Sequence, residues 1–208
     1  MSDKLCVELC SGSARLAHAF GDAGWEAITV DIDPKTNPTI CADVQTLSAR
    51  DIILAMKRPA FSDYREVFVA MAPPCNATSR ANPNGWLRTI GPYLRIGAAC
   101  TDIARDILQA KGHGFFMLEQ PDGRAHWFYG TPSFIINLGD FGKPTKKRSQ
   151  IWTNVPLGLI PASVFRKPQT HRSRKEIHHN ELERTPAQRA AYPLPFVNAV
   201  LEAVESQP

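Results

Sequence analysis

Cys75 occupies a position in this 208-residue sequence where a thiol could act as a catalytic nucleophile. It follows Pro73 and Pro74 directly after an apolar run at residues 67–71. Two consecutive prolines cannot lie within a central strand, so the chain leaves the sheet there and places Cys75 at the carboxyl end of the strand. A thiol becomes nucleophilic when nearby cations or a helix dipole favour the thiolate. The alternative, a buried structural cysteine, suits Cys100 in its apolar helix better.

A carboxylate follows a second apolar run in the same way. The run at residues 114–118 ends in Glu119, Gln120 and Pro121, and Glu119 comes 44 residues after Cys75. Neighbouring strands of a sheet lie about 4.8 Å apart, so the thiol and the carboxylate can face one bound base if these two strands are adjacent. A glutamate at the end of a strand can instead cap the following helix.

Two strand ends and a later loop have the composition of a nucleotide-binding site. The first strand ends in a turn of small residues around Gly12, where backbone N–H groups can approach a ligand closely. The second strand ends at Asp31, and an acid at this position can accept hydrogen bonds from both hydroxyls of a ribose. Asp43, in the later loop, could accept a hydrogen bond from an adenine amino group. An exposed Asp in a loop also forms turns without any ligand. The candidate cofactor contacts, which include one residue of the Pro-Pro turn, are Leu9, Cys10, Ser11, Gly12, Asp31, Ile32, Asp43, Val44 and Pro73.

An alternation of short β-rich apolar runs and longer helical patterns must position these residues. Such an alternation predicts an α/β domain with a mostly parallel sheet. In an open parallel sheet, ligands bind beyond the carboxyl ends of the strands, which is where the candidate residues fall. We expect strands near residues 4–9, 25–31, 66–72, 114–119, 134–139 and 149–154. We expect helices near residues 14–23, 47–57, 91–111 and 186–205, the last with Thr185 as its N-cap and Pro186 in its first turn.

The composition is that of one soluble globular domain, with 43% hydrophobic and 21% charged residues. No apolar run approaches membrane-spanning length and no signal peptide is evident, so we expect a cytoplasmic protein without membrane contact. The five cysteines form no CxxC pair and have no His at zinc spacing, which argues against disulfides and a bound metal. We expect residues 1–208 to form a single domain and the protein to be a monomer or a weak dimer.

Positive charge is concentrated in one segment. Between Lys143 and Arg184 there are ten Lys or Arg residues and three Glu, a net charge of +7, whereas the rest of the chain carries −3. A local basic stretch is typical of a protein that binds a polyanion such as nucleic acid, although a solvated loop gives the same pattern. The candidate nucleic-acid contacts are Ser79, Arg80, Lys146, Arg148, Arg172, Arg174 and Lys175.

The order of the motifs resembles that of the DNA cytosine-5 methyltransferases, particularly their compact members. The matching segments read ELCSGSA, VDID, CADV, APPCNATS, EQP and GKPTKKRSQIW, over residues 5–154 with a weak extension into the final helix. This resemblance implies a Rossmann-like fold with helices on both faces of the sheet. It also implies S-adenosylmethionine as the cofactor and transfer of its methyl group to carbon 5 of cytosine in DNA.

The resemblance agrees with the cofactor contacts above and assigns further roles. Cys75 would be the nucleophile, and Glu119 would engage N3 and the amino group of cytosine. Lys147 corresponds to the first arginine of a basic motif that holds the base. Asn198 corresponds to a late asparagine near the nucleophile loop and is a further candidate cofactor contact. A thiolate that adds to C6 makes C5 an enamine carbon able to attack an electrophilic methyl group, and Glu119 would stabilise the adduct at N3. The target base must be flipped out of a duplex or already single-stranded.

The short length of residues 155–185 bears on target specificity, and other functions remain open for this sequence. Residues 155–185 form a short basic loop or insertion, too few for the target-recognition domain that the family usually carries, so we expect a very short target or broad modification. An RNA cytosine-5 methyltransferase with the same core, or a catalytically silent nucleic-acid or cofactor-binding module, remains an alternative. An oxidoreductase would need more glycines after the first strand. A metal-dependent nuclease would need the three loop histidines His171, His178 and His179 as ligands.

Overall fold

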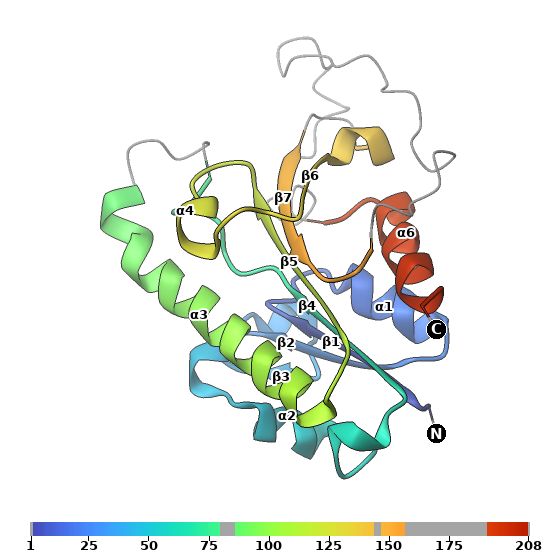
Figure 1. The fold of residues 1–208 in the computed structure, drawn as a ribbon. Helices are drawn as coiled ribbons and strands as arrows, with labels where there is room; N and C mark the ends of the chain where they lie inside the picture. The colour runs from blue at the N-terminus through green and yellow to red at the C-terminus, as the bar shows by residue number, and fades with distance from the viewer. Residues whose placement is uncertain (1, 80–85, 144–146, 157–190, 208) are drawn as a thin grey trace.

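In the computed structural model, which describes residues 2–79, 86–143, 147–156 and 191–207, seven strands form one mixed sheet (Figure 1). The strand order is β3-β2-β1-β4-β5-β7-β6. Strands β1 to β5 run parallel to one another, whereas β7 runs antiparallel to both β5 and β6. The strands are β1 (Lys4–Leu9), β2 (Glu26–Asp31), β3 (Ile40–Cys41), β4 (Glu66–Met71), β5 (Phe115–Pro121), β6 (Phe134–Asn137) and β7 (Arg148–Thr153).

Helices cover both faces of this sheet (Figure 1). Helices α1 and α6 pack on one face, and α2 and α3 pack on the other. The α-helices in the described ranges are α1 (Arg15–Asp22), α2 (Ala49–Ala55), α3 (Trp86–Lys111), α4 (His126–Tyr129) and α6 (Leu194–Glu205). Short 3-10 turns are η1 (Pro34–Thr36), η2 (Val44–Thr46), η3 (Phe61–Asp63) and η4 (Leu138–Phe141). None of the described helices is both long and apolar enough to cross a membrane.

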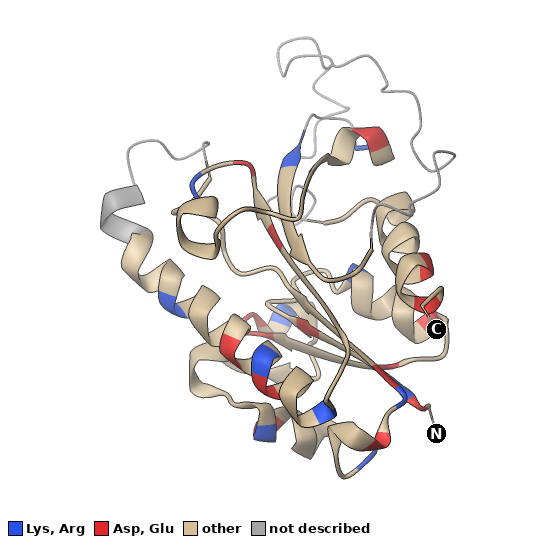
Figure 2. Ribbon diagram, in the orientation of Figure 1, with Lys and Arg blue, Asp and Glu red and all other residues tan. Residues whose placement is uncertain are grey.

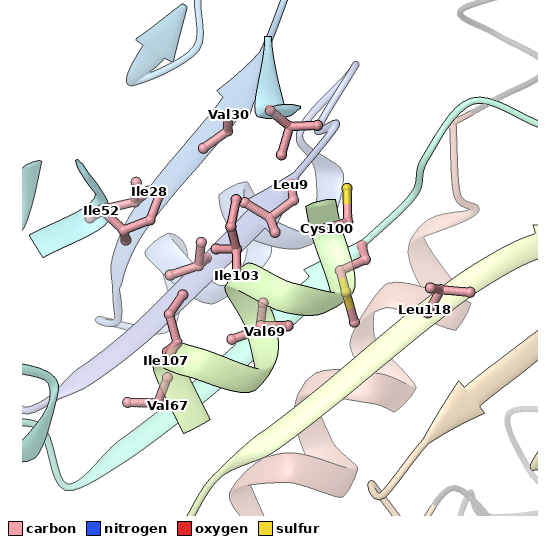
Figure 3. Close-up of a cluster of buried hydrophobic side chains, with 14 of the residues drawn as sticks. Leu9, Ile28, Val30, Ile52, Val67, Val69, Cys100, Ile103, Ile107 and Leu118 are labelled. Atoms are coloured by element: carbon pink, nitrogen blue, oxygen red, sulfur yellow. The ribbon is translucent and has the colours of Figure 1, made fainter. Parts of the chain in front are cut away.

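Two buried apolar clusters fix the strands, one on each face. Alternate residues of a strand point to opposite faces, so Cys6 joins the cluster under α1 and α6 while Val7 joins the cluster under α2 and α3. On the first face the rings of Phe20 and Phe68 stack with centroids 4.8 Å apart. Figure 3 shows the second cluster, in which Ile103 of α3 packs over β1, β2 and β4. Burying each such side chain contributes about 1.5–3 kcal/mol, which keeps the strand ends in place.

The structure confirms the α/β class, the mostly parallel sheet and six of the expected strands. It adds β3 and the four-residue helix α4, which the sequence patterns did not predict. The expected helix over 186–205 was wrong at its start, because Ala191, Tyr192 and Pro193 are not helical and α6 begins at Leu194. Pro193 and Pro195 explain this, since prolines inside a helix remove hydrogen bonds but are tolerated in its first turn. Thr185 and Pro186 lie outside the described residues.

Candidate active site

Cys75 lies in a turn that directly follows β4. Its carbonyl oxygen accepts hydrogen bonds from the backbone N–H groups of Thr78, at 3.1 Å, and Ser79, at 2.9 Å. These bonds close the turn after the two prolines and leave the Cys75 thiol half-buried. Ser79 also forms an isolated β-bridge with Gly123, which follows β5. The nucleophile loop, residues 72–79, is therefore held against the end of the neighbouring strand.

Gln120 joins this loop to β5 through two hydrogen bonds. Its Nε2 donates to the carbonyl oxygen of Pro73 at 2.6 Å, and its Oε1 accepts from the Thr78 hydroxyl at 2.7 Å. The Gln120 side chain is only 2% exposed, so water does not compete for these partners. On the other side of the loop, the Asn76 side chain donates to the Tyr93 hydroxyl of α3 at 2.9 Å. Sequence patterns did not identify Gln120 as a functional residue.

Glu119 is buried on β5, next to the strand that precedes Cys75. Met71 of β4 pairs with Leu118 of β5, so the two strands are adjacent, as the shared site requires. The Lys147 ammonium lies 3.7 Å from Oε1 of Glu119. That oxygen is buried and has no hydrogen-bond partner among the described residues. A buried acceptor without a partner is costly unless a ligand or water satisfies it, so this carboxylate is suited to bind a polar ligand.

The electrostatics of the site place the thiol between two opposite charges. Burial raises the pKa of Cys75 above its usual value, and the Glu119 carboxylate raises it further. The positive charge of Lys147 and a backbone hydrogen bond in the turn lower this pKa. Neutralising Glu119, by a proton or by a hydrogen-bonded base, removes a negative charge that disfavours the thiolate. A ligand that neutralised Glu119 would therefore lower the pKa of Cys75.

Tyr192 completes the buried surroundings of Glu119. Burial raises the pKa of Tyr192 well above its usual value. The negative charges of Glu119 and Glu8 and a hydrogen bond to Glu119 raise it further. The Tyr192 carbonyl accepts a hydrogen bond from the Arg15 side chain at 2.7 Å, and its ring packs against Phe196 of α6, with centroids 5.5 Å apart. Tyr192 thus connects α1 and α6 to the carboxylate. No motif in the sequence marks this residue.

A small pocket lies at the carboxyl ends of β1 and β2, on the other side of the Pro-Pro turn from Glu119. Its volume of about 120 Å³ is below the roughly 300–1,000 Å³ of typical small-molecule sites, so it has room for only part of a small-molecule ligand. Ile32 is 67% exposed there, an apolar surface that a flat ring could cover. Five of its lining residues were predicted cofactor contacts: Cys10, Asp31, Ile32, Asp43 and Val44. Val30, Ala42, Pro74 and Ile96 also line it.

Hydrogen bonds fix the acids and the glycine turn of this pocket. Asp31 accepts from the backbone N–H of Gly12 at 2.7 Å and of Asp33 at 2.9 Å, so each carboxylate oxygen keeps a lone pair for a ligand. Asp43 caps η2 by accepting from the Gln45 N–H at 3.0 Å. The buried hydroxyl of Ser11 has no hydrogen-bond partner in the described part of the chain. The remaining lone pairs of Asp31 and the unpartnered hydroxyl of Ser11 leave polar atoms beside this pocket that a ligand could bind.

Five predicted cofactor contacts do not line this pocket: Leu9, Ser11, Gly12, Pro73 and Asn198. Leu9 is buried in the core under α2 and α3. Pro73 is buried, and its carbonyl is taken by Gln120, so Pro74 lines the pocket in its place. Asn198 is exposed on α6, because the buried face of that helix is formed by its apolar residues.

Few of the predicted nucleic-acid contacts fall in the described ranges. The Arg148 side chain, at the start of β7, is 58% exposed and lies 3.7 Å from the Asp122 carboxylate. Figure 2 shows the basic segment at the start of β7 in blue. Ser79 is half-buried in the nucleophile loop. Outside the described residues lie Arg80, Lys146, Arg172, Arg174 and Lys175.

The described fold is an α/β arrangement compatible with a Rossmann-like fold. Comparison of the chain with protein-family models gave no match, and comparison with curated proteins gave none either. Within the described ranges, no three His, Cys, Asp or Glu side chains come together as ligands for a metal ion. The argument for function therefore rests on the site itself.

Proposed function

We propose that this protein transfers a methyl group from S-adenosylmethionine to carbon 5 of cytosine in DNA, through a covalent adduct of Cys75. The observation that carries the proposal is the convergence of three side chains at one sheet edge. Cys75 is close enough to Glu119 and Lys147 for both charges to change its pKa, and Lys147 lies 3.7 Å from Glu119. A thiol, an acid and a cation beside a small pocket lined by two aspartates are the groups that this reaction needs.

Each of the three side chains has a distinct task in the proposed reaction. The Cys75 thiolate adds to C6 of the cytosine ring, which moves electron density to C5 and to N3. Glu119 hydrogen-bonds or protonates N3 and so stabilises the charge of the adduct. Once C5 carries the methyl group, loss of its proton and departure of the Cys75 sulfur restore the C5–C6 double bond. Lys147 favours the thiolate and holds the carboxylate in position.

The residues of the small pocket fit the nucleoside part of S-adenosylmethionine. Asp31 would accept the ribose hydroxyls, Asp43 the adenine amino group, and Ile32 would cover a face of the ring. When bound, this cofactor supplies an electrophilic methyl group. The pocket opens beside Pro74, which precedes Cys75, so a group extending from it reaches the nucleophile loop.

A methyl-transfer assay on matched oligonucleotides tests the proposal. Tritium-labelled S-adenosylmethionine is offered with single-stranded DNA, duplex DNA and RNA of one sequence. We expect label in DNA cytosine, loss of transfer in Cys75→Ser, and a fall of about 10²- to 10⁴-fold in Glu119→Gln. Cys41→Ser, which removes an exposed thiol, is the matched control and should retain activity. Label in RNA alone would favour the RNA enzyme, and no transfer to any substrate would favour a silent binding module.

A further inference from the structure

Two reduced cysteines from distant parts of the chain meet at the small pocket. Cys10 follows β1 and Cys100 lies on α3, yet their sulfur atoms are 3.7 Å apart. Cys100 is buried in the core under α3 (Figure 3), whereas Cys10 is partly exposed and lines the pocket. A disulfide needs a sulfur–sulfur distance of about 2.05 Å, so the two sulfur atoms would have to approach each other by less than about 2 Å to bond.

We propose that Cys10 and Cys100 form an oxidative modification site, at which a peroxide converts the thiol pair into a disulfide that alters the pocket. An oxidant entering the pocket reaches Cys10 first, because Cys100 has no exposed surface. Among the described thiols, only Cys10 and Cys100 lie within hydrogen-bonding distance of each other, so Cys41 and Cys75 have no comparable partner there.

The reaction balances with hydrogen peroxide as the oxidant. The Cys10 sulfur attacks one peroxide oxygen, the O–O bond breaks, and a sulfenic acid and one water form. The Cys100 sulfur then displaces the hydroxyl group from Cys10, which leaves as a second water as the S–S bond forms. The two thiols lose two hydrogens and the peroxide is reduced. Because the hydrogen bond with Cys10 and then burial raise the pKa of Cys100, the second step should accelerate as the pH rises.

The disulfide would change the pocket through the turn that follows Cys10. Gly12, two residues along, donates its N–H to Asp31 at 2.7 Å. Drawing Cys10 towards α3 would displace this turn and lengthen that hydrogen bond, and would also change the pocket wall. Oxidation is therefore expected to weaken ligand binding at least about tenfold, the change that 1.4 kcal/mol produces. The weaker ligand binding rests on the proposed function, whereas formation of the disulfide does not.

Peptide mapping tests the disulfide directly. Reduced protein is treated with hydrogen peroxide, free thiols are blocked with iodoacetamide, and a non-reducing tryptic digest is analysed by mass spectrometry. We expect the peptide of residues 5–15 linked to that of residues 96–105, with fragmentation assigning the link to Cys10 rather than Cys6. Cys100→Ala and, independently, Cys10→Ser should abolish the link, and the matched control Cys41→Ala should retain it. Peroxide that oxidises Cys41 but yields no such link overturns the proposal.

Calorimetry with S-adenosylmethionine then tests the effect on the pocket. Reduced protein should bind it, peroxide-treated protein should bind it at least about tenfold more weakly, and dithiothreitol should restore the affinity. The double variant Cys10→Ser/Cys100→Ala, which lacks both thiols, should bind equally before and after peroxide. Equal affinity of the reduced and linked wild type would overturn the coupling. Reduced protein that fails to bind would count against the proposed function, while the peptide map would still decide whether the disulfide forms.

Discussion

Replacing Gln120 with Leu should destabilise the protein by an amount that the loop contacts define. The substitution keeps the volume but removes both hydrogen bonds to the nucleophile loop. The Pro73 carbonyl would stay buried without a partner, which costs about 1–3 kcal/mol. The Thr78 hydroxyl would still donate to the Cys75 carbonyl, at 3.3 Å. Losing its bond to Gln120 therefore costs only the net value of one hydrogen bond, about 1 kcal/mol. The sum is about 2–4 kcal/mol, or a Tm lower by about 4–16 °C.

Urea denaturation of a double-mutant cycle measures this loss. Gln120→Leu, Thr78→Val and the double variant should show a coupling of about 0.5–1.5 kcal/mol, the net value of the bond between the two side chains. Gln109→Leu, on the exposed side of α3, is the matched control and should change stability by no more than about 0.5 kcal/mol. A Gln120→Leu loss as small as that of the control would refute the view that Gln120 anchors the loop.

Three further predictions concern charge and ligand binding. Glu119→Gln should lower the pKa of Cys75 and Lys147→Met should raise it, because the carboxylate disfavours and the ammonium favours the thiolate; the pH profile of alkylation of Cys75 by iodoacetamide checks both directions. Burial raises the pKa of Glu8 from 4.5 to about 7, so the folded state binds the proton more tightly and stability falls as the pH rises from 4.5 through 7. Relative to Glu8→Gln, the free energy of unfolding of the wild type should fall by about 3 kcal/mol over this range, at 1.36 kcal/mol per pKa unit. Urea titrations measure this, and a difference between the two proteins that does not change with pH would refute the prediction. S-adenosylmethionine at 100 times its Kd should stabilise the wild type by about 2.7 kcal/mol in calorimetry, and Asp31→Ala should reduce this at a fixed concentration; an equal effect in both would remove Asp31 from the pocket.

Local sequence patterns were sufficient to predict most of the strands, but they do not specify whether two strands pair in parallel or antiparallel. The apolar runs and the turn residues marked β1, β4 and β5 to within two residues. The antiparallel direction of β7 depends on its partners in space, which no short pattern specifies. The late start of α6 was visible in the sequence, because Pro193 and Pro195 exclude a continuous helix there.

The candidate site could be predicted where its residues end a strand. Cys75 and Glu119 follow apolar runs and stop at prolines, so the sheet brings them to one edge. Gln120 and Tyr192 reach this edge through contacts with residues far away in the sequence, and no spacing rule identifies such contacts. Asn198 could have been excluded as a pocket residue by helical periodicity, since the apolar residues around it define the buried face of α6.

A covalent complex with DNA that contains 5-fluorocytosine is the most direct test of the proposed chemistry. Fluorine at C5 cannot leave as a proton does, so the adduct should persist once the methyl group has been transferred. We expect a denaturation-resistant complex that requires S-adenosylmethionine, with the modified base attached to Cys75 in the tryptic peptide of residues 66–80. Attachment to another residue, or a complex that also forms with Cys75→Ser, would contradict the account. So would cofactor-dependent methylation of ordinary cytosine by Cys75→Ser.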